Sequence, residues 1–417
     1  MSWNIVLNKF IEIKKKANDA GIDLWDYDKD IETCIEYWIR RLNETEYTEL
    51  FSCLELNEYA DFLLVRYGNY SSVFGGESEA TFDTFWDIYD GFYRECRSVV
   101  INIRKDELVL VPFRKFRNLN EGEETSYENI QKRIQTAKCI EFSNKLDGSM
   151  QSARFYDGEY VMAGSQSLDR DNSWRLADGY RMLTENDNYL TMLKENADKT
   201  FIFEYISARD AHVVKYDEEG LFLIGIRDVN TGEEASYKEV LEYAKRYGTL
   251  TTEVFEKTLD QVISELDDKK SSEAEGFVVN IDGYKVKIKY NDYVYMHKML
   301  SAISSINLII QNIADDRFDD LIAKVPLAYR NRVMNIADIV FKYKNETENM
   351  INETYAKAPK DDKKEFMIWV SENADIRIQG YLRNKYLGKG YNVLKRQSSY
   401  LKLKDMGVND YEYTNEE

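Results

Sequence analysis

The sequence predicts an α+β protein with antiparallel strands in the middle of the chain and helices at both ends. In the middle, apolar residues recur with a period of two, in paired runs separated by turn residues, as in β-hairpins. Toward both ends, the spacing of apolar residues changes to three and four, which is typical of amphipathic helices. We therefore expect a helical N-terminal extension over 1–60, an α+β domain over 61–293 and an all-α domain over 294–417.

The N-terminal helices are the first predicted elements. Trp3, Val6, Phe10 and Ile13 follow a helical spacing, so a helix is expected over 3–18. A second helical pattern runs from about 31 to 42. Both are interpreted as packing elements without chemistry.

The central region combines strands with short helices. Its first hairpin pairs two apolar runs across the turn Arg104-Lys105-Asp106-Glu107. Ser236 and Glu239 form a capping-box pattern that opens a helix. The expected strands cover 99–103, 108–111, 139–143, 151–156, 160–162, 201–206, 221–226, 277–279 and 284–290. The expected helices cover 127–136, 173–195 and 236–246.

Composition restricts the kind of partner. The chain has 417 residues, 43% of them hydrophobic, which is ample for real cores. With 56 basic and 75 acidic residues, the formal net charge is −19. This charge argues against a general nucleic-acid coat or a membrane-surface protein, so a polyanion would have to bind at a local patch.

Cysteine and histidine usage points to a reducing compartment. Cys34, Cys53, Cys96 and Cys139 show no paired spacing, and the chain has two histidines, so a zinc site is not expected. We interpret the thiols as reduced and buried, and the protein as cytoplasmic. No signal-peptide pattern opens the chain, and no apolar run approaches the roughly 18 residues of a membrane span.

The tetrapeptide Lys145-x-Asp147-Gly148 lies between two predicted strands. A lysine can attack a phosphorus atom only as the neutral amine, which requires a lowered pKa and a fixed direction. In such a turn, Gly148 would let the backbone approach a ligand, and Asp147 would orient a sugar or a metal-bound water. Taken alone, the same tetrapeptide is equally typical of a surface hairpin with a solvated lysine.

Further charged residues follow Lys145 in a fixed order. Glu204 lies between aromatic residues in a predicted strand, where a carboxylate is costly unless it faces a cleft or a cation. Glu275 precedes Gly276 at the start of a hairpin, and its return strand places Lys285, Lys287 and Lys289 on one face. Individually, these residues fit a core acid, a turn acid and solvated strand lysines.

The ordered set carries more information than its members. It resembles the motifs of the covalent nucleotidyltransferase superfamily, and most closely those of the T-even phage RNA ligases that reseal broken tRNA. The resemblance covers roughly residues 60 to 300. It rests on Lys145-x-Asp147-Gly148 together with Glu95-Cys96-Arg97, Lys115-Phe116-x-Asn118-Leu119-Asn120-Glu121, Phe203-Glu204, Glu275-Gly276, Lys287-Ile288-Lys289 and the segment 226–237.

The resemblance implies an antiparallel-sheet nucleotidyltransferase core of the ATP-grasp-like ligase type, within 61–293. It also implies ATP-dependent RNA joining in three steps. Lys145 attacks the α-phosphate of ATP, AMP passes to a 5′-phosphate of RNA, and a 3′-hydroxyl then displaces AMP. The implied use is RNA or tRNA repair in a bacterial or phage-infected cell.

The resemblance also implies roles for the individual residues. Lys287 and Lys289 would contact the α-phosphate and keep Lys145 neutral by like-charge repulsion. The predicted ATP-binding residues are Arg97, Lys115, Lys145, Asp147, Gly148, Glu204, Glu275, Lys287 and Lys289. Mg²⁺, with Mn²⁺ as a second candidate, would be held by Glu204, Glu275 and Asp147.

One segment departs from the family pattern. The phage enzymes carry lysines after the strand that follows the nucleophile, whereas this chain has no cation in 162–167. One phosphate or substrate contact must therefore differ. The alternative functions are a DNA ligase, a capping enzyme or another adenylyltransferase of the superfamily, and a non-catalytic RNA-binding protein on a ligase scaffold.

The C-terminal region reverses the charge of the chain. Between Arg377 and Lys404 there are eight basic residues and no acidic ones, with Tyr381, Tyr386, Tyr391 and Tyr400 interleaved. Phosphate neutralisation plus stacking is a common way to hold RNA. The candidate RNA contacts are Arg383, Lys385, Lys389, Lys395 and Arg396. A basic face packed on acidic protein surface explains the pattern nearly as well. We expect a monomer.

Overall fold

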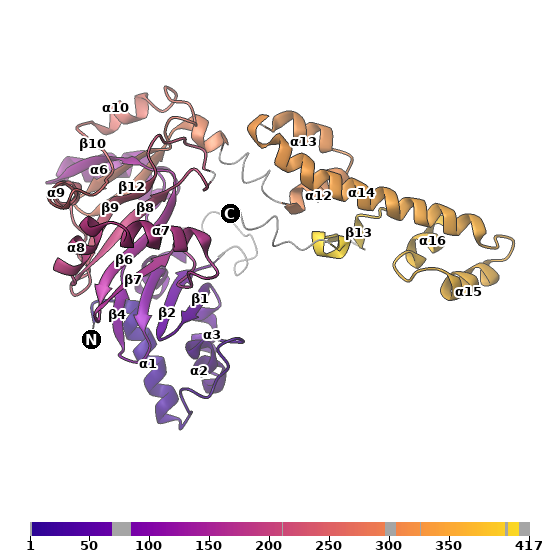
Figure 1. Cartoon of the computed structure of the whole chain (residues 1–417), viewed down its shortest axis with the longest axis horizontal. Helices are drawn as coiled ribbons and strands as arrows, with labels where there is room; N and C mark the ends of the chain where they lie inside the picture. The colour runs from indigo at the N-terminus through magenta and orange to yellow at the C-terminus, as the bar shows by residue number, and fades with distance from the viewer. Residues whose placement is uncertain are drawn as a thin grey trace. The chain divides into compact units, whose positions relative to one another are not determined.

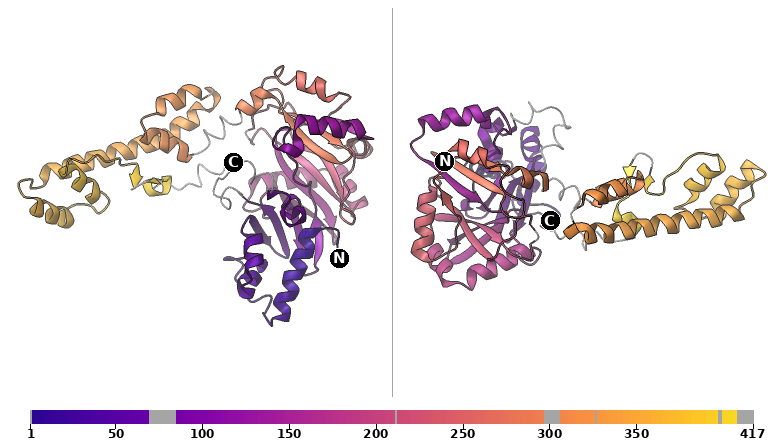
Figure 2. Two further views of the ribbon diagram at one scale, coloured as in Figure 1. Left: turned by 180° about the vertical axis from the view of Figure 1, so that it is seen from behind. Right: turned by 90° about the horizontal axis from the view of Figure 1, so that it is seen from above.

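The computed structural model describes residues 2–68, 85–210, 212–296, 306–325, 327–396 and 399–407. The chain divides into two compact units, Met1–Val294 and Tyr295–Glu417. Each unit is coloured by position along the chain in Figure 1 and Figure 2.

In the described ranges, the first sheet of the N-terminal unit has four strands, all from residues 54–110. Its strands follow the order β1-β2-β3-β4 and pair antiparallel. Helices α1, α2 and α3 share one hydrophobic core with this sheet (Figure 1). The elements are α1 Ile5–Asp19, α2 Cys34–Leu42, α3 Thr45–Phe51, β1 Leu54–Tyr59, β2 Phe62–Tyr67, α5 Phe92–Glu95, β3 Arg97–Asn102 and β4 Glu107–Leu110.

This arrangement differs from the expected extension over 1–60. The segment is not a separate helical body, because Phe10 and Trp38 pack in the same core as Val65 and Val99. It also supplies a strand, β1, that the helical pattern did not indicate. The extension is therefore part of the N-terminal unit.

Two further antiparallel sheets carry the motifs. One has the order β10-β5-β11-β12 and the other β7-β6-β8-β9. The hairpins and central strands expected from the period-two pattern are present within two residues of the predicted bounds. The strands are β5 Ile140–Lys145, β6 Ser149–Tyr156, β7 Glu159–Gly164, β8 Lys199–Ile206, β9 Gly220–Asp228, β10 Val254–Phe255, β11 Gly276–Ile281 and β12 Tyr284–Lys289.

Helices pack on the faces of these sheets. The helix predicted over 127–136 is confirmed as α6 Tyr127–Thr136, and Ser236 with Glu239 forms the expected capping box of α9 Tyr237–Tyr247. The helix expected over 173–195 is instead two helices, α7 Trp174–Thr184 and α8 Asp187–Glu195. The Asn186 side chain caps α8 by accepting from Asn188 N, which interrupts the helix. A short helix, α10 Leu259–Ser264, precedes β11.

The C-terminal unit is mainly helical. The long helix α14 Leu327–Lys357 runs through it and packs near its start on α12 Ile306–Ala314 (Figure 2). The unit also contains α13 Phe318–Lys324, α15 Lys363–Asn373, α16 Gln379–Tyr386, β13 Lys395–Arg396 and β14 Ser399–Tyr400. The two short strands pair as a hairpin, so the all-α prediction for this region is incomplete.

Three of the four cysteines are buried, as the sequence predicted. Cys34, Cys53 and Cys96 are buried free thiols, but Cys139 is exposed because it lies just before the start of β5. The expectation of four buried thiols is therefore wrong at Cys139.

Among the helices of the described ranges, none combines the length and apolar character of a membrane span.

Candidate active site

Lys145 lies where two sheets meet. It is the last residue of β5, and residues 146–148 connect β5 to β6 in the neighbouring sheet. A Cβ atom on Gly148 would lie 2.4 Å from the carbonyl oxygen of Tyr205. Gly148 thus permits close approach of the turn to β8, rather than to a ligand as expected from the sequence. This contact fixes the direction in which the turn presents Lys145.

The carboxylate of Glu275 joins two of the predicted lysines. Its Oε2 lies 2.6 Å from Lys145 Nζ, and its Oε1 lies 2.8 Å from Lys289 Nζ. The strand register produces this arrangement, because Gly276 pairs with Lys145 on one side and with Lys289 on the other. Glu275 is 2% exposed, so these ion pairs are shielded from water.

Glu204 lies in β8 beside the same turn. Its Oε1 accepts a hydrogen bond of 3.0 Å from Gly148 N. Burial raises the pKa of Glu204 to about 7; Lys145 opposes this rise, and Glu275 adds to it. The aromatic neighbours of Glu204 in the sequence suggested an acid that faces a cleft, and Glu204 does line the cavity beside Lys145. Its raised pKa places the carboxyl group near the balance between its neutral and charged forms at neutral pH.

The electrostatics of Lys145 differ from the expectation. Burial opposes its charged form, but the carboxylates of Glu275 and Glu204 outweigh burial and raise the pKa of Lys145. Without bound nucleotide, Lys145 is therefore a paired ammonium group and not the neutral amine that nucleophilic attack requires. A ligand that draws Glu275 away from Lys145 would remove the strongest opposing charge.

Lys287 is the lysine of this site whose charged form is disfavoured. Burial and the positive charges of Lys115, Arg97 and Lys145 hold the pKa of Lys287 well below its usual value. Its Nζ lies 5.2 Å from the ring centroid of Phe116. An anionic ligand at this position would reverse the balance and favour the ammonium form.

Asp147 is a structural residue of the turn. Its Oδ2 accepts hydrogen bonds from Val213 N and Val214 N at 2.9 and 3.0 Å, and its Oδ1 accepts from the Tyr293 hydroxyl at 2.8 Å. With both oxygens engaged and the residue 6% exposed, Asp147 is not placed as a metal ligand. Its predicted metal role is not supported by this geometry.

The sequence did not single out the partners of this turn. Tyr293 follows β12 and reaches back to Asp147, while the Tyr216 hydroxyl accepts a hydrogen bond of 2.7 Å from Asp147 N. Asp210 accepts a hydrogen bond of 2.7 Å from Ser149 Oγ and pairs with His212 at 2.9 Å. The loop after β8 contains several acidic residues and Tyr216, which could have indicated a functional segment. However, no spacing rule connects this loop to Lys145.

A cavity of about 160 Å³ opens beside Lys145. Its apolar walls suit a flat heterocycle, and its cations suit phosphate. Ser143, Tyr237 and Thr252 add polar atoms. The lining also includes Arg97, Phe113, Phe116, Asn144, Leu146, Met150, Glu204, Ile224, Val278, Lys287 and Lys289.

Arg97 and Lys115 are the two predicted ATP-binding cations that lie outside the sheets of β5 and β6, and they take different positions. Arg97 lines the cavity, with its guanidinium 4.9 Å from the ring centroid of Phe116. Lys115 does not line it; its Nζ lies 5.0 Å from the ring centroid of Trp86 and contributes positive charge near Lys287. The structure thus gathers Arg97, Lys145, Glu204, Glu275, Lys287 and Lys289 and leaves Lys115 at the periphery.

The protein alone offers no complete metal cage. Within the described residues, no group of three or more His, Cys, Asp or Glu side chains is arranged to hold an ion. Both oxygens of Glu275 are paired with lysines, and Glu204 is the remaining acid at the cavity. Mg²⁺ commonly takes only one or two protein carboxylates and fills its coordination with substrate phosphates and water.

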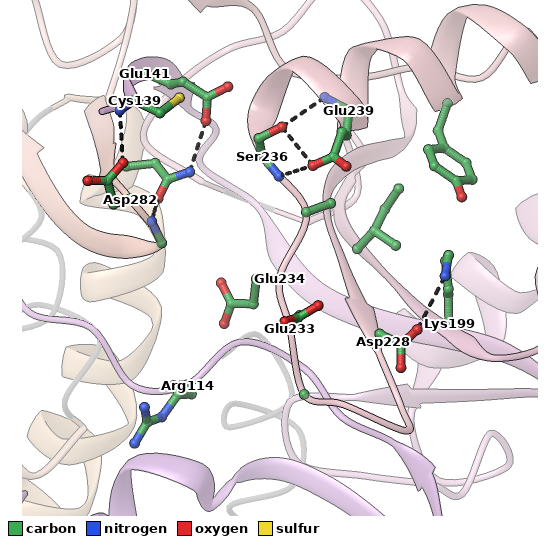
Figure 3. A pocket seen from close by; sticks show the side chains of 16 residues that line it. Arg114, Cys139, Glu141, Lys199, Asp228, Glu233, Glu234, Ser236, Glu239 and Asp282 are labelled. Carbon is green, nitrogen blue, oxygen red and sulfur yellow. Dashed lines mark hydrogen bonds and ion pairs between the residues drawn. The ribbon is translucent and has the colours of Figure 1, made fainter. Parts of the chain in front are cut away.

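A larger cavity, of about 700 Å³, lies elsewhere in the N-terminal unit (Figure 3). Its walls carry the carboxylates of Glu141, Asp228, Glu233, Glu234 and Asp282 and few cations. Such a surface repels phosphate. The smaller cavity beside Lys145 is therefore the better candidate for chemistry on a nucleotide.

The predicted RNA contacts of the C-terminal unit are partly engaged within the protein. Lys395 pairs with Asp315 at 2.8 Å, Lys385 donates to Asn352, and Arg383 donates to Ser371 Oγ at 3.0 Å. Lys389 is exposed, and the side chain of Arg396 lies outside the described residues.

The interleaved aromatic residues are also in internal contacts. The Tyr386 ring stacks on Phe366 with centroids 4.2 Å apart, and Tyr381 packs against Tyr391 at 5.7 Å. The structure therefore favours the interpretation of this segment as a packed basic face over that of a stacking platform.

Comparison with known proteins shows what this sequence is similar to. Residues 95–302 match an RNA ligase family model. A provisionally named RNA ligase of Thermovibrio ammonificans is 25% identical over 408 residues, covering 87% of this chain and 98% of that protein. A provisionally named bifunctional polynucleotide kinase/RNA ligase of Autographa californica nuclear polyhedrosis virus is 27% identical, covering 56% of this chain but 35% of that protein.

Among solved structures, Naegleria gruberi RNA ligase with PPi gives a TM-score of 0.34 at 19% identity, covering 40% of this chain and 55% of that one. That structural likeness is too low to carry an argument. Residues 95–302, which match the family model, include all the residues gathered around Lys145, namely Arg97, Glu204, Glu275, Lys287 and Lys289. Together, the family model and the two sequence relatives show that this chain is similar in sequence to RNA ligases.

Proposed function

We propose that the protein is an ATP-dependent RNA ligase that joins a 5′-phosphate to a 3′-hydroxyl through AMP carried on Lys145. The observation that carries this proposal is the convergence of Lys145, Glu275 and Lys289, joined at 2.6 and 2.8 Å, at a cavity that also contains Arg97 and Lys287. Nucleotidyl transfer needs a directed nucleophile and positive charge around the phosphate, and this set supplies both.

In the first step, the purine would occupy the apolar part of the cavity and the α-phosphate would lie among Lys145, Lys287 and Lys289. Phosphate binding favours the charged form of Lys287, because an adjacent anion stabilises an ammonium group. A charged Lys287 in turn disfavours charge on Lys145. Lys145 Nζ gives up its proton to solvent water, the bond from Nζ to the α-phosphorus forms, and the P–O bond to the β-phosphate breaks, so that pyrophosphate leaves.

A divalent cation would enter with the ATP phosphates and supply charge neutralisation there. Glu204 is the chain's own candidate to meet it, because Glu275 already holds two lysines. The remaining steps use the same positive set. AMP passes to the 5′-phosphate of an RNA strand, and the 3′-hydroxyl of a second strand then displaces it.

The finer features remain part of the proposal. They are a use in RNA or tRNA repair, a cytoplasmic location in a bacterial or phage-infected cell, a monomeric state, and an RNA contact at the exposed Lys389. The free thiols of Cys34, Cys53 and Cys96 support a reducing compartment.

Strand joining tests the proposal. The protein is incubated with ATP, Mg²⁺ and a labelled single-stranded RNA bearing a 5′-phosphate and a 3′-hydroxyl, in parallel with a DNA strand of the same sequence. We expect joined or circular RNA that depends on both the 5′-phosphate and ATP. Joining of DNA but not RNA would favour the DNA-ligase alternative, and AMP transfer to protein or nucleotide without joining would favour another adenylyltransferase.

A further inference from the structure

Two arginines outside the cavity stack on aromatic rings of α7. The guanidinium of Arg209, in the segment after β8, lies 4.5 Å from the ring centroid of Trp174, the first residue of α7. Just before the helix, the guanidinium of Arg170 lies 3.8 Å from the ring centroid of Tyr180. We call Arg170, Trp174, Tyr180 and Arg209 the α7 arginine surface.

Within the described residues, the guanidinium groups of Arg170 and Arg209 are not paired with an acid, whereas Lys145 and Lys289 are. In the part of the chain that the structure describes, no carboxylate oxygen lies within 4.0 Å of Arg170 or Arg209, and both residues are exposed. The nearby acid Asp178 accepts a hydrogen bond of 2.7 Å from the Tyr205 hydroxyl and pairs with Arg181 at 2.9 Å. A guanidinium that stacks on a ring keeps its N–H edge available for phosphate oxygens.

The segment after β8 connects this surface to the nucleophile. In that segment, Val213 N and Val214 N donate to Asp147, and Asp210 accepts a hydrogen bond from Ser149 Oγ. Arg175, on the first turn of α7, pairs with the same Asp210 at 2.8 Å. Arg209 therefore extends from a segment whose other residues hold both ends of the Lys145 turn.

We propose that the α7 arginine surface binds the RNA strand whose 5′-phosphate receives AMP from Lys145, an inference that rests on the proposed function. The two guanidinium groups provide backbone phosphate contacts, and the rings of Trp174 and Tyr180 hold these groups in place by stacking on them. The surface lies in the N-terminal unit and is distinct from the basic segment after Arg377.

The test compares the full-length protein with Arg170→Ala/Arg209→Ala and with Arg246→Ala. Arg246 is a matched control because it is also exposed and stacks on an aromatic ring, Tyr247, at 5.2 Å, but on α9. Three quantities are measured: AMP labelling of the protein, affinity for a 5′-phosphorylated single-stranded RNA at several salt concentrations, and AMP transfer to that RNA. Arg209→Lys separates charge from planar stacking.

We expect the double variant to label with AMP as the wild type does, but to bind RNA at least about tenfold more weakly and transfer AMP correspondingly slowly at subsaturating RNA. Its log–log salt slope should be shallower by roughly 1.4, because two phosphate contacts are lost and each contributes roughly 0.7 on a single strand. Arg246→Ala should match the wild type. Normal RNA binding and AMP transfer by the double variant would overturn this inference and leave the proposed function intact, whereas a wild type that does not label would overturn the proposed function itself.

Discussion

Lys145 Nζ lies 2.6 Å from Glu275 Oε2, so the nucleophile of the proposed reaction is ion-paired before any nucleotide arrives. The same carboxylate holds Lys289 at 2.8 Å. A cation that attracts Glu275 would therefore release Lys145. Substrate binding and nucleophile activation are coupled through one buried acid.

Replacing this acid should destabilise the N-terminal unit. Glu275→Gln leaves two lysines next to a neutral, buried amide, and loss of one partner of a buried ion pair typically costs about 3–5 kcal/mol. Because Lys145 and Lys289 retain some exposure, we expect the free energy of unfolding to fall by about 2–3 kcal/mol, measured by urea denaturation. Glu185→Gln, which removes the exposed partner of Arg181, should cause no measurable change. Equal stability of the two variants would contradict the account.

Glu204 should make stability depend on pH. Its pKa is about 7 in the folded protein and 4.5 when solvated, so folding disfavours the carboxylate. Below pH 4.5 both states are protonated and this group adds no cost. As pH rises from 4.5 to 7, the cost grows to roughly 3 kcal/mol and then stays constant. Relative to the wild type, Glu204→Gln should therefore gain stability across that range in urea titrations; a pH-independent difference would exclude the raised pKa.

The turn should not tolerate a side chain at Gly148. Gly148→Ala places a Cβ atom 2.4 Å from the Tyr205 carbonyl oxygen, and overpacking of this kind costs about 1–3 kcal/mol. We expect AMP transfer to Lys145 to fall at least about tenfold because the turn must shift. Gly164→Ala is the control, since its Cβ atom meets only an ordinary contact of 3.7 Å. Full activity of Gly148→Ala would show that the close approach is unimportant.

The hydroxyl of Tyr293 should position the turn without taking part in chemistry. Tyr293→Phe removes a buried hydrogen bond to Asp147 Oδ1 and leaves that oxygen with one fewer donor, at a cost of about 1–3 kcal/mol. We expect a slower rate of AMP transfer with an unchanged pH profile. A shifted pH profile in a rate assay would instead indicate a direct proton-transfer role for Tyr293.

The sequence predicted the elements whose signals are local. The capping box at Ser236, the hairpins and the helix α6 depend on near neighbours, and all three are present. The break between α7 and α8 was also local, but the Asn186 cap was hidden within a continuous apolar period. Strand β1 was missed because a half-exposed edge strand has no strong alternation.

The site was predictable in its members but not in its electrostatics. The order of Lys145, Glu204 and Glu275 could be recognised along the chain, because strands of the predicted sheets carry them. Which lysine has a lowered pKa and which a raised pKa depends on strand register. Gly276 pairs with both lysine-bearing strands and so places Glu275 between Lys145 and Lys289, while Lys287 is left among cations. No spacing rule contains that information.

The central claim is that Lys145 carries AMP, and labelling with α-labelled ATP and Mg²⁺ tests it most directly. The wild type and Lys145→Ala are first treated with pyrophosphate to remove any bound AMP, then labelled, denatured and separated, and the modified peptide is mapped. The account predicts a covalent label on Lys145 of the wild type and none on a folded Lys145→Ala. A label that persists in Lys145→Ala, or a wild type that takes up none, would contradict it.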